Sequence, residues 1–146
     1  MARIKKWRGK EVTQEVAQNV AQALGEIALR AEGYAKKELR KGHGVVTGTL
    51  RRSIHVVQPG YAWNSDNVVP STGSPERGGK QVEAVRSGST LTVQVGSGLV
   101  YALAIHQGWE KGYKQTKGTF AGYHFITNGV EKAKKDVNKV LKKYKL

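Results

Sequence analysis

The chain has 146 residues, carries a formal net charge of +14 and contains no cysteine. A chain of this length buries about 68% of its extended surface on folding, so we expect one domain spanning residues 1–146. The lack of cysteine excludes disulfide bonds and cysteine-ligated zinc. No apolar run approaches the ~20 residues that a membrane span requires, and no signal-peptide core follows the basic N-terminus. We therefore expect assembly in the cytoplasm and no membrane partner.

The positive charge is concentrated at the two ends of the chain. Residues 1–10 hold five Lys or Arg and no acid, and residues 130–146 hold seven Lys against Glu131 and Asp136, so each end contributes +5. The rest of the chain contributes only +4. Basic ends of this kind suit phosphates, an acidic partner surface or plain solubility.

Residues 11–41 are predicted to form one long helix. Apolar side chains recur there at spacings of three and four residues, which is the helical pattern, and the rod would be about 46 Å long. Gly25 and Gly33 inside it indicate either tolerated imperfections or close packing and a bend. Gly42 favours a helix end. We interpret five glutamates as the solvated side of this helix: Glu11, Glu15, Glu26, Glu32 and Glu38.

The middle of the chain predicts short strands separated by a long loop. A β-like run covers residues 53–58, and residues 59–81 then contain all three prolines. A loop of that length is usually functional or disordered, and we expect it to order against a neighbouring subunit. Alternating apolar residues predict a half-buried strand over 90–95, paired with 82–85 through a turn at 86–89. The apolar stretch 100–105 favours a short buried helix.

The C-terminal part predicts a second polar loop over 109–122 and an amphipathic helix over 126–145. One side of that helix is apolar, and Lys132, Lys135, Lys139 and Lys142 line the other. The order helix, strands, helix predicts an α+β fold in which a long N-terminal helix and a C-terminal helix pack on a small antiparallel sheet, with long loops.

Titratable residues show no catalytic or metal-binding pattern. The four histidines are scattered, and the acids outside the helices are isolated, so neither paired carboxylates nor clustered metal ligands are indicated. Residues 73–80 lack the spacing of a phosphate-binding loop. We therefore expect no enzyme, no metal and no cofactor. Trp63 and Trp109 fall in loops, where interface and core roles are equally expected.

Three stretches together resemble a known protein family. Val46–Ile54 follows the long helix and contains a Gly-x-Leu-Arg-x-Ser-Ile pattern, and Tyr101–Trp109 contains a Tyr-Ala pair followed by a glycine. Residues 122–135 form an aromatic lead into the last helix. The matching residues are Gly48, Leu50, Arg51, Ser53, Ile54, Tyr101, Ala102, Gly108 and Phe125. From the residues alone, Gly48 suits a positive φ, and Leu50 and Ile54 are expected to point into the core.

In this order, the stretches resemble the small neck and tail-completion (head–tail joining) proteins of long-tailed bacteriophages. The resemblance implies a structural virion protein without catalytic residues, located in the neck between head and tail. It implies a homo-oligomeric ring, for which we expect six subunits. It also implies contacts with head-completion or adaptor proteins, with tail terminator or tail-tube proteins, and non-specific proximity to viral DNA.

Two alternatives stay open at this point. A basic nucleic-acid-binding protein would explain the net charge, although the chain shows no recognisable nucleic-acid-binding module. Within the phage interpretation, a neck ring and a tail terminator are not distinguished. A small hydrolase or nuclease is least favoured. Because a channel that holds DNA through many lysines would impede its passage, we expect the lysines of the last helix to face outward or toward a partner.

Overall fold

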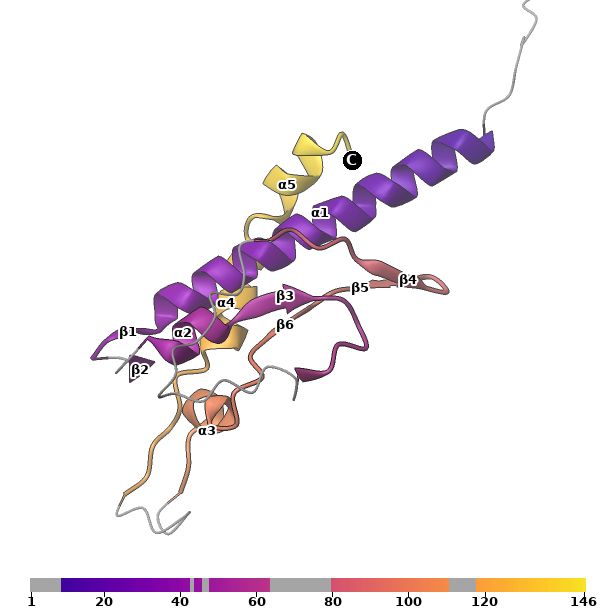
Figure 1. Ribbon diagram of the computed structural model, residues 1–146. Helices are drawn as coiled ribbons and strands as arrows, with labels where there is room; N and C mark the ends of the chain where they lie inside the picture. The colour runs from indigo at the N-terminus through magenta and orange to yellow at the C-terminus, as the bar shows by residue number, and fades with distance from the viewer. Residues whose placement is uncertain (1–8, 43, 46–47, 64–79, 111–117) are drawn as a thin grey trace, which may run out of the picture.

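The computed structural model describes residues 9–42, 44–45, 48–63, 80–110 and 118–146, and the fold is α+β, as predicted (Figure 1). Its helices are α1 (Gly9–Glu38), α2 (Thr49–Ser53), α3 (Ala102–Gln107), α4 (Phe125–Lys134) and α5 (Val137–Lys143). Its strands are β1 (Arg40–Lys41), β2 (Gly44–Val45), β3 (His55–Val57), β4 (Val85–Ser87), β5 (Thr90–Thr92) and β6 (Gln94–Gly96).

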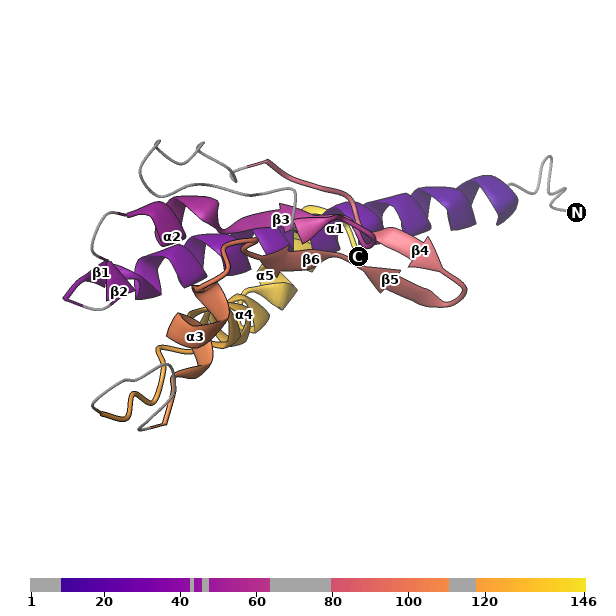
Figure 2. The same cartoon turned by 60° about the horizontal axis from the view of Figure 1, so that its bottom comes forward.

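The long first helix is confirmed, and α4, α5, β3 and β6 pack against it. α1 ends at Glu38, and Gly42 soon after it has the positive φ of 79° that glycine adopts readily. The C-terminal half of α1 is covered by α4 on one side and by the strands on another, whereas its first turns project beyond the rest of the molecule (Figures 1 and 2). α1 is thus both the base of the core and an extended arm.

α4 packs against α1 through small residues that let the two backbones approach closely. A Cβ atom added at Gly129 would lie 2.6 Å from the carbonyl oxygen of Ala31 and 2.8 Å from the backbone nitrogen of Ala35. Ala28 and Ala133 are buried in the same layer. No side chain therefore fits at position 129 without a shift of one helix.

A second close approach places the segment before β4 on α1. The backbone nitrogen of Ala84 donates to the carbonyl of Ala21 at 3.2 Å. A Cβ at Gly25 would lie 2.0 Å from the Val82 carbonyl oxygen, whereas one at Gly33 would meet nothing within 4 Å. The sequence left open whether these glycines mark close packing or tolerated imperfections of the helix. Gly25 marks close packing, and Gly33 is an imperfection that the helix tolerates.

The predicted strand over 90–95 is two strands with different partners. β5 pairs antiparallel with β4, so that Val85 lies opposite Thr92. β6 pairs antiparallel with β3, so that Val56 lies opposite Val95. The prediction of one continuous strand was wrong, because the first part of this stretch pairs with β4 and the second part pairs with β3. The partner of the first is 85–87 rather than 82–85, with Gly88 (φ 60°) in the turn.

The β-like run predicted over 53–58 is confirmed as β3, and a short helix that was not predicted, α2, lies between Gly48 and that strand. Gly48 has a φ of 79°, as expected, and its carbonyl accepts the Arg52 backbone N–H at 3.0 Å. Leu50 and Ile54 are buried, also as expected. They join a core cluster with the end of α1, α3 and the start of α4: Ala35, Leu39, Leu50, Ile54, Leu99, Ala102 and Phe125.

The predicted C-terminal helix over 126–145 is broken into α4 and α5 at Lys135 and Asp136. Aspartate is a weak helix former, and here its carboxylate has partners on α1. The Tyr34 hydroxyl donates to Asp136 at 2.8 Å, and the Arg30 guanidinium donates to it at 3.3 Å. The break lets α5 follow α1 while α4 covers the core. Val140 and Ala133 are buried as the apolar side predicted.

The two contrasting glycines provide a matched test of the packing between α1 and α4. Gly129→Ala should lower the free energy of unfolding by about 1–2 kcal/mol, because overpacking outweighs the gain in helix propensity. Gly33→Ala should raise it by up to about 1 kcal/mol, since only the propensity changes. Urea denaturation followed by circular dichroism measures both. A Gly129→Ala variant as stable as the wild type would contradict the close approach.

Candidate interaction surfaces

Four of the nine residues that carry the family resemblance come together in the core of the folded chain. Leu50, Ile54, Ala102 and Phe125 belong to one core cluster, although they come from three separate stretches. The buried Ser53 hydroxyl lies 2.6 Å from that of Ser97 and donates to the carbonyl of Leu50 at 2.7 Å.

The other motif residues set the backbone or lie at the surface. Gly108 has a φ of 85°, and a Cβ there would lie 1.9 Å from the Phe120 carbonyl oxygen, so only glycine fits. Arg51 and Tyr101 are exposed. The motif therefore serves mainly to build the fold.

No known family model, curated protein or solved structure matches the chain.

Over the described ranges, no group of three or more His, Asp or Glu side chains is placed to hold a metal ion. Over the same ranges, no helix is long and apolar enough to cross a membrane. The surfaces of the chain, and the ion pairs that shape them, are therefore the features to consider.

The interpretation of the α1 glutamates as a solvated side was wrong for Glu26 and Glu32, which are buried. Glu26 accepts from Lys143 at 2.6 Å, from Arg30 at 3.0 Å and from the Tyr144 hydroxyl at 3.2 Å. Its hydrogen bond from Lys143, reinforced by those from Arg30 and Tyr144, lowers the pKa of Glu26 below its usual value despite the opposing effect of burial. Glu26 is thus the anchor that fastens the end of α5 to α1.

Three further acidic residues form ion pairs or hydrogen bonds within the chain: Glu32, Glu38 and Asp136. Glu32 pairs with Lys36 at 2.7 Å within α1, and Glu38 pairs with Lys132 on α4. The hydrogen bond from Tyr34, together with Arg30, lowers the pKa of Asp136. The i,i+4 spacing of Glu26–Arg30 was visible in the sequence, but it did not reveal that Lys143 and Tyr144 from the C-terminal end would also bond Glu26.

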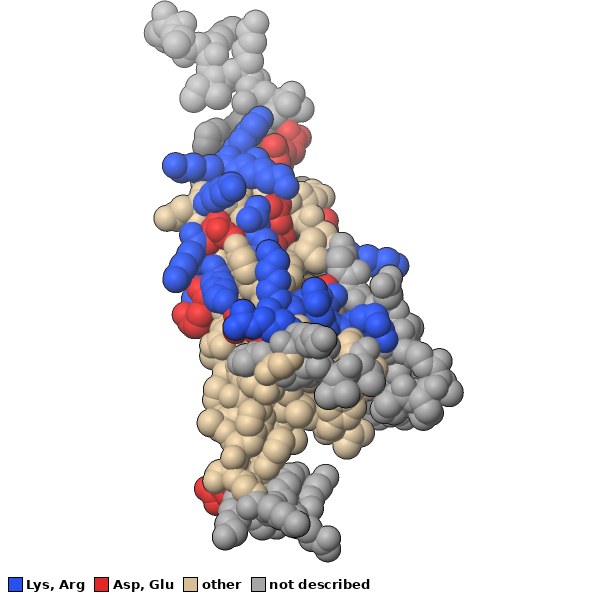
Figure 3. All heavy atoms as spheres, turned by 90° about the vertical axis from the view of Figure 1, so that its left-hand side faces the viewer, with Lys and Arg blue, Asp and Glu red and all other residues tan. Residues whose placement is uncertain are grey.

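The C-terminal lysines lie on the outside of the subunit. Lys135, Lys139 and Lys142 are exposed, and Lys132 is exposed while paired with Glu38. Figure 3 shows Lys and Arg side chains gathered over the upper and middle part of one face, at the height of α5 and the middle of α1, with mostly uncharged residues below. Their predicted orientation away from the core is confirmed. A role in contacting a partner stays a prediction.

Trp63 packs on the sheet of its own chain. Its ring lies 5.2 Å from those of His55 and Tyr61, centroid to centroid, and a Cβ at Gly96 would lie 2.9 Å from it. The side chain stays half-buried. Most of the predicted 59–81 loop contact falls on 64–79, which lies outside the described residues.

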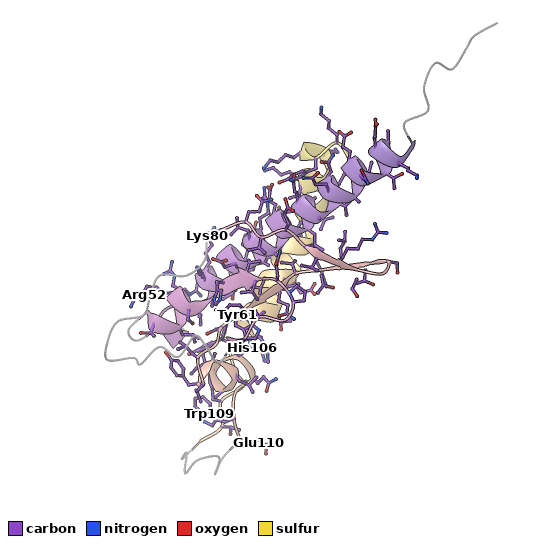
Figure 4. The ribbon with its side chains drawn as sticks, turned by 45° about the vertical axis from the view of Figure 1, so that its right-hand side comes forward. Arg52, Tyr61, Lys80, His106, Trp109 and Glu110 are labelled. Atoms are coloured by element: carbon purple, nitrogen blue, oxygen red, sulfur yellow. The ribbon has the colours of Figure 1, made fainter. Side chains whose placement is uncertain are left out.

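Trp109 closes the base of the predicted 109–122 loop. Its backbone exchanges two hydrogen bonds of 2.8 Å with Phe120, and the two rings lie 4.6 Å apart. Figure 4 shows Trp109 and Glu110 at one end of the molecule, beyond His106 on α3. Residues 111–117 of this loop lie outside the described residues.

His106 ties α3 to the first turn of α4. Its Nδ1 accepts the Ile126 backbone N–H at 3.4 Å, and its backbone carbonyl accepts the His124 N–H at 2.9 Å. Burial, followed by the neighbouring His124, lowers the pKa of His106. The hydrogen bond from Ile126 requires a neutral imidazole ring, because Nδ1 accepts it and therefore carries no proton.

The helix favoured over 100–105 is α3, which begins at Ala102, and the expected burial holds for Ala102 but is wrong for Val100 and Leu103. Val100 is 87% exposed and Leu103 is 62% exposed. The first turns of α1 are similarly apolar and uncovered, with Val12 55% and Val16 46% exposed. Val130, on the predicted apolar side of the C-terminal helix, is exposed as well. Periodicity alone does not tell which apolar residues stay outside the core.

The Glu26 anchor predicts a specific pH dependence of stability. The pKa of folded Glu26 lies below its unfolded value of 4.5, so its carboxylate stabilises the fold above that pH and loses the effect as pH falls through the folded pKa. The difference in free energy of unfolding between wild type and Glu26→Gln should therefore be largest near neutral pH and shrink in acid. Urea titrations at a series of pH values measure this difference.

Glu131→Gln is the matched control, because Glu131 pairs only with Lys134, at the exposed surface. Its effect should be small at every pH. An effect of Glu26→Gln that does not vary with pH would show that the carboxylate charge does not hold α5.

Proposed function

We propose that this chain is a structural subunit of the head–tail connection of a tailed bacteriophage, a neck or tail-completion protein that forms a ring and joins the tail to the DNA-filled head. The observation that carries the proposal is the meeting of the motif residues in one core. Leu50 and Ile54 from the first stretch, Ala102 from the second and Phe125 from the third pack together at the end of α1.

The use of charged side chains supports a structural role. Glu26, Glu38 and Asp136 join α1 to the two C-terminal helices through ion pairs and hydrogen bonds. A carboxylate that is engaged in an ion pair between helices is not available as a general acid or base, because proton transfer requires access to a substrate. The projecting start of α1 and the exposed apolar residues of α3 leave surfaces for assembly.

The basic surface favours one other function, nucleic-acid binding. Lysines gathered on one face are the electrostatic signature of contact with phosphates. Several of these cations are already paired within the chain, because Lys132, Lys143 and Arg30 each bond an acid of the same subunit. Such pairs reduce the charge that a nucleic acid would meet. The same surfaces would also serve a tail terminator ring.

A stop codon in place of Trp63, in the phage that carries the gene, tests the proposal. We expect DNA-filled heads and finished tails that stay separate in electron micrographs, because the subunit that joins them is missing. The same stop codon in a suppressor host is the control, and it should restore joined virions.

Joined virions in the absence of the intact chain would contradict the proposal. A block in DNA replication or packaging, with no free tails accumulating, would favour the nucleic-acid-binding function instead. A purified chain that binds duplex DNA with a steep dependence on salt would support that second outcome.

A further inference from the structure

Two short stretches of backbone, residues 105–109 and 120–124, are hydrogen-bonded to each other between α3 and α4, and we call them the α3–α4 junction. At the outer end of the junction, Trp109 and Phe120 exchange two backbone hydrogen bonds of 2.8 Å. At its inner end, the His106 side chain reaches across to α4. Figure 4 shows Trp109 beyond His106, toward one end of the molecule. The His106 ring is therefore the side-chain link between this end and α4.

The first turn of α4 receives its hydrogen-bond acceptor from α3. The residue before the helix, His124, has a φ of 47° and makes no side-chain hydrogen bond to the first turn, although helices commonly begin with a side chain that accepts one of the free N–H groups there. The Nδ1 atom of His106 accepts the Ile126 N–H instead, at 3.4 Å. Since Nδ1 is the acceptor, Nε2 carries the proton and donates to the Thr127 hydroxyl oxygen at 3.3 Å. The neutral ring of His106 thus caps α4.

A second proton on the His106 ring would remove this cap. Both ring nitrogens of a charged histidine are donors, so the Nδ1–H group would face the Ile126 N–H. The positive charge would also lie at the N-terminus of α4, where the aligned peptide dipoles disfavour cations. Both ring bonds are long for hydrogen bonds, so they hold the neutral ring only weakly. Protonation therefore favours a ring that has left α4.

The groups packed against the His106 ring do not offset this effect. The rest of α3 contains no titratable side chain, and residues 120–127 contain only Tyr123 and His124. The His124 ring lies 5.6 Å from that of His106, centroid to centroid, and Phe125 packs at 5.0 Å. Among the described residues no acid bonds the ring. Burial, followed by His124, accordingly lowers the pKa of His106.

We propose that His106 is a pH-sensitive cap of α4, whose neutral ring holds α3 on the first turn of α4 and whose protonation loosens the α3–α4 junction. The packing of α4 on α1 should persist, because it depends on Gly129, further along the helix. The end of the molecule that carries Trp109 and Glu110 (Figure 4) would then differ between neutral and mildly acidic solution. This inference does not depend on the proposed function.

The direction of the pH dependence follows from the two forms of the junction. In the opened form the His106 ring is free of α4, and its pKa returns toward the ordinary value of 6.5. As the pH falls below that value, the opened form binds a proton before the closed form does, so opening becomes more favourable. One proton is involved, so the equilibrium constant for opening should rise by up to about tenfold per pH unit until the closed form is protonated too.

Nitrogen NMR of the imidazole rings tests the cap directly in the wild-type chain. The neutral His106 ring should carry its proton on Nε2, and its pKa should lie below 6.5. A neutral ring with its proton on Nδ1 would contradict the proposal, because Nδ1 could then not accept the Ile126 N–H. A pKa at or above the ordinary value would contradict it as well.

Hydrogen exchange of the junction amides measures the loosening. The protection factors of the Trp109, Phe120 and His124 amides should fall as the pH drops below 6.5. The Ala133 amide, on α4 where it packs against α1, is the internal control and should keep its protection over the same range. Junction amides whose protection stays constant, or falls together with that of Ala133, would rule out a local cap.

Two matched variants assign the effect to one ring. His106→Gln has a neutral side chain whose carbonyl can accept the same N–H, so its junction protection should not vary over this pH range, whatever its level. His124→Asn introduces a residue that tolerates the left-handed conformation, and it should keep the pH dependence because His106 is intact. A pH dependence that survives in His106→Gln, or disappears in His124→Asn, overturns the proposal.

Discussion

The close approach of α4 to α1 at Gly129 is the constraint on which the rest of the structure depends. With no side chain at this position, the α4 backbone lies against Ala31 and Ala35, where a Cβ would be 2.6–2.9 Å from their atoms. This close contact positions Phe125 at the start of α4. The Phe125 side chain fills the core cluster between α1, α2 and α3. A wider separation of the two helices would leave a cavity around Phe125.

The ion pairs follow from that geometry and explain how a strongly basic chain stays folded. Once α4 and α5 lie along α1, Glu26, Glu38 and Asp136 face lysines and an arginine brought from the C-terminal helices and from α1 itself. These acids neutralise part of the C-terminal charge where it approaches the core, and the remaining lysines face outward. The fold thus separates a cohesive inner region from two regions whose apolar side chains are exposed, the projecting start of α1 and the surface of α3.

Much of this architecture follows from the sequence, for physical reasons that also set the limits. The three- and four-residue spacing predicted α1 and the C-terminal helical region, because one apolar side must be buried. The break at Asp136 was not predicted, since it depends on Tyr34 and Arg30, more than a hundred residues earlier. The burial of Glu26 depends on a similarly distant contact with Lys143, and the switch of partners between β5 and β6 depends on the pairing of β6 with β3. The outward side chains of Val100 and Leu103 escape prediction because they are apolar and yet no element among the described residues covers them.

The central claim is that α4 and the C-terminal half of α1 form one cooperative unit, from which the start of α1 extends without support. Native-state hydrogen exchange tests it directly, because it measures the free energy of opening for each backbone amide. Amides of α4 and of α1 residues 21–38 should exchange with one common free energy, equal to that of global unfolding. Amides of α1 residues 13–18 should open with a smaller one. Exchange of α4 through a separate, lower-energy opening while α1 stays protected would contradict the account.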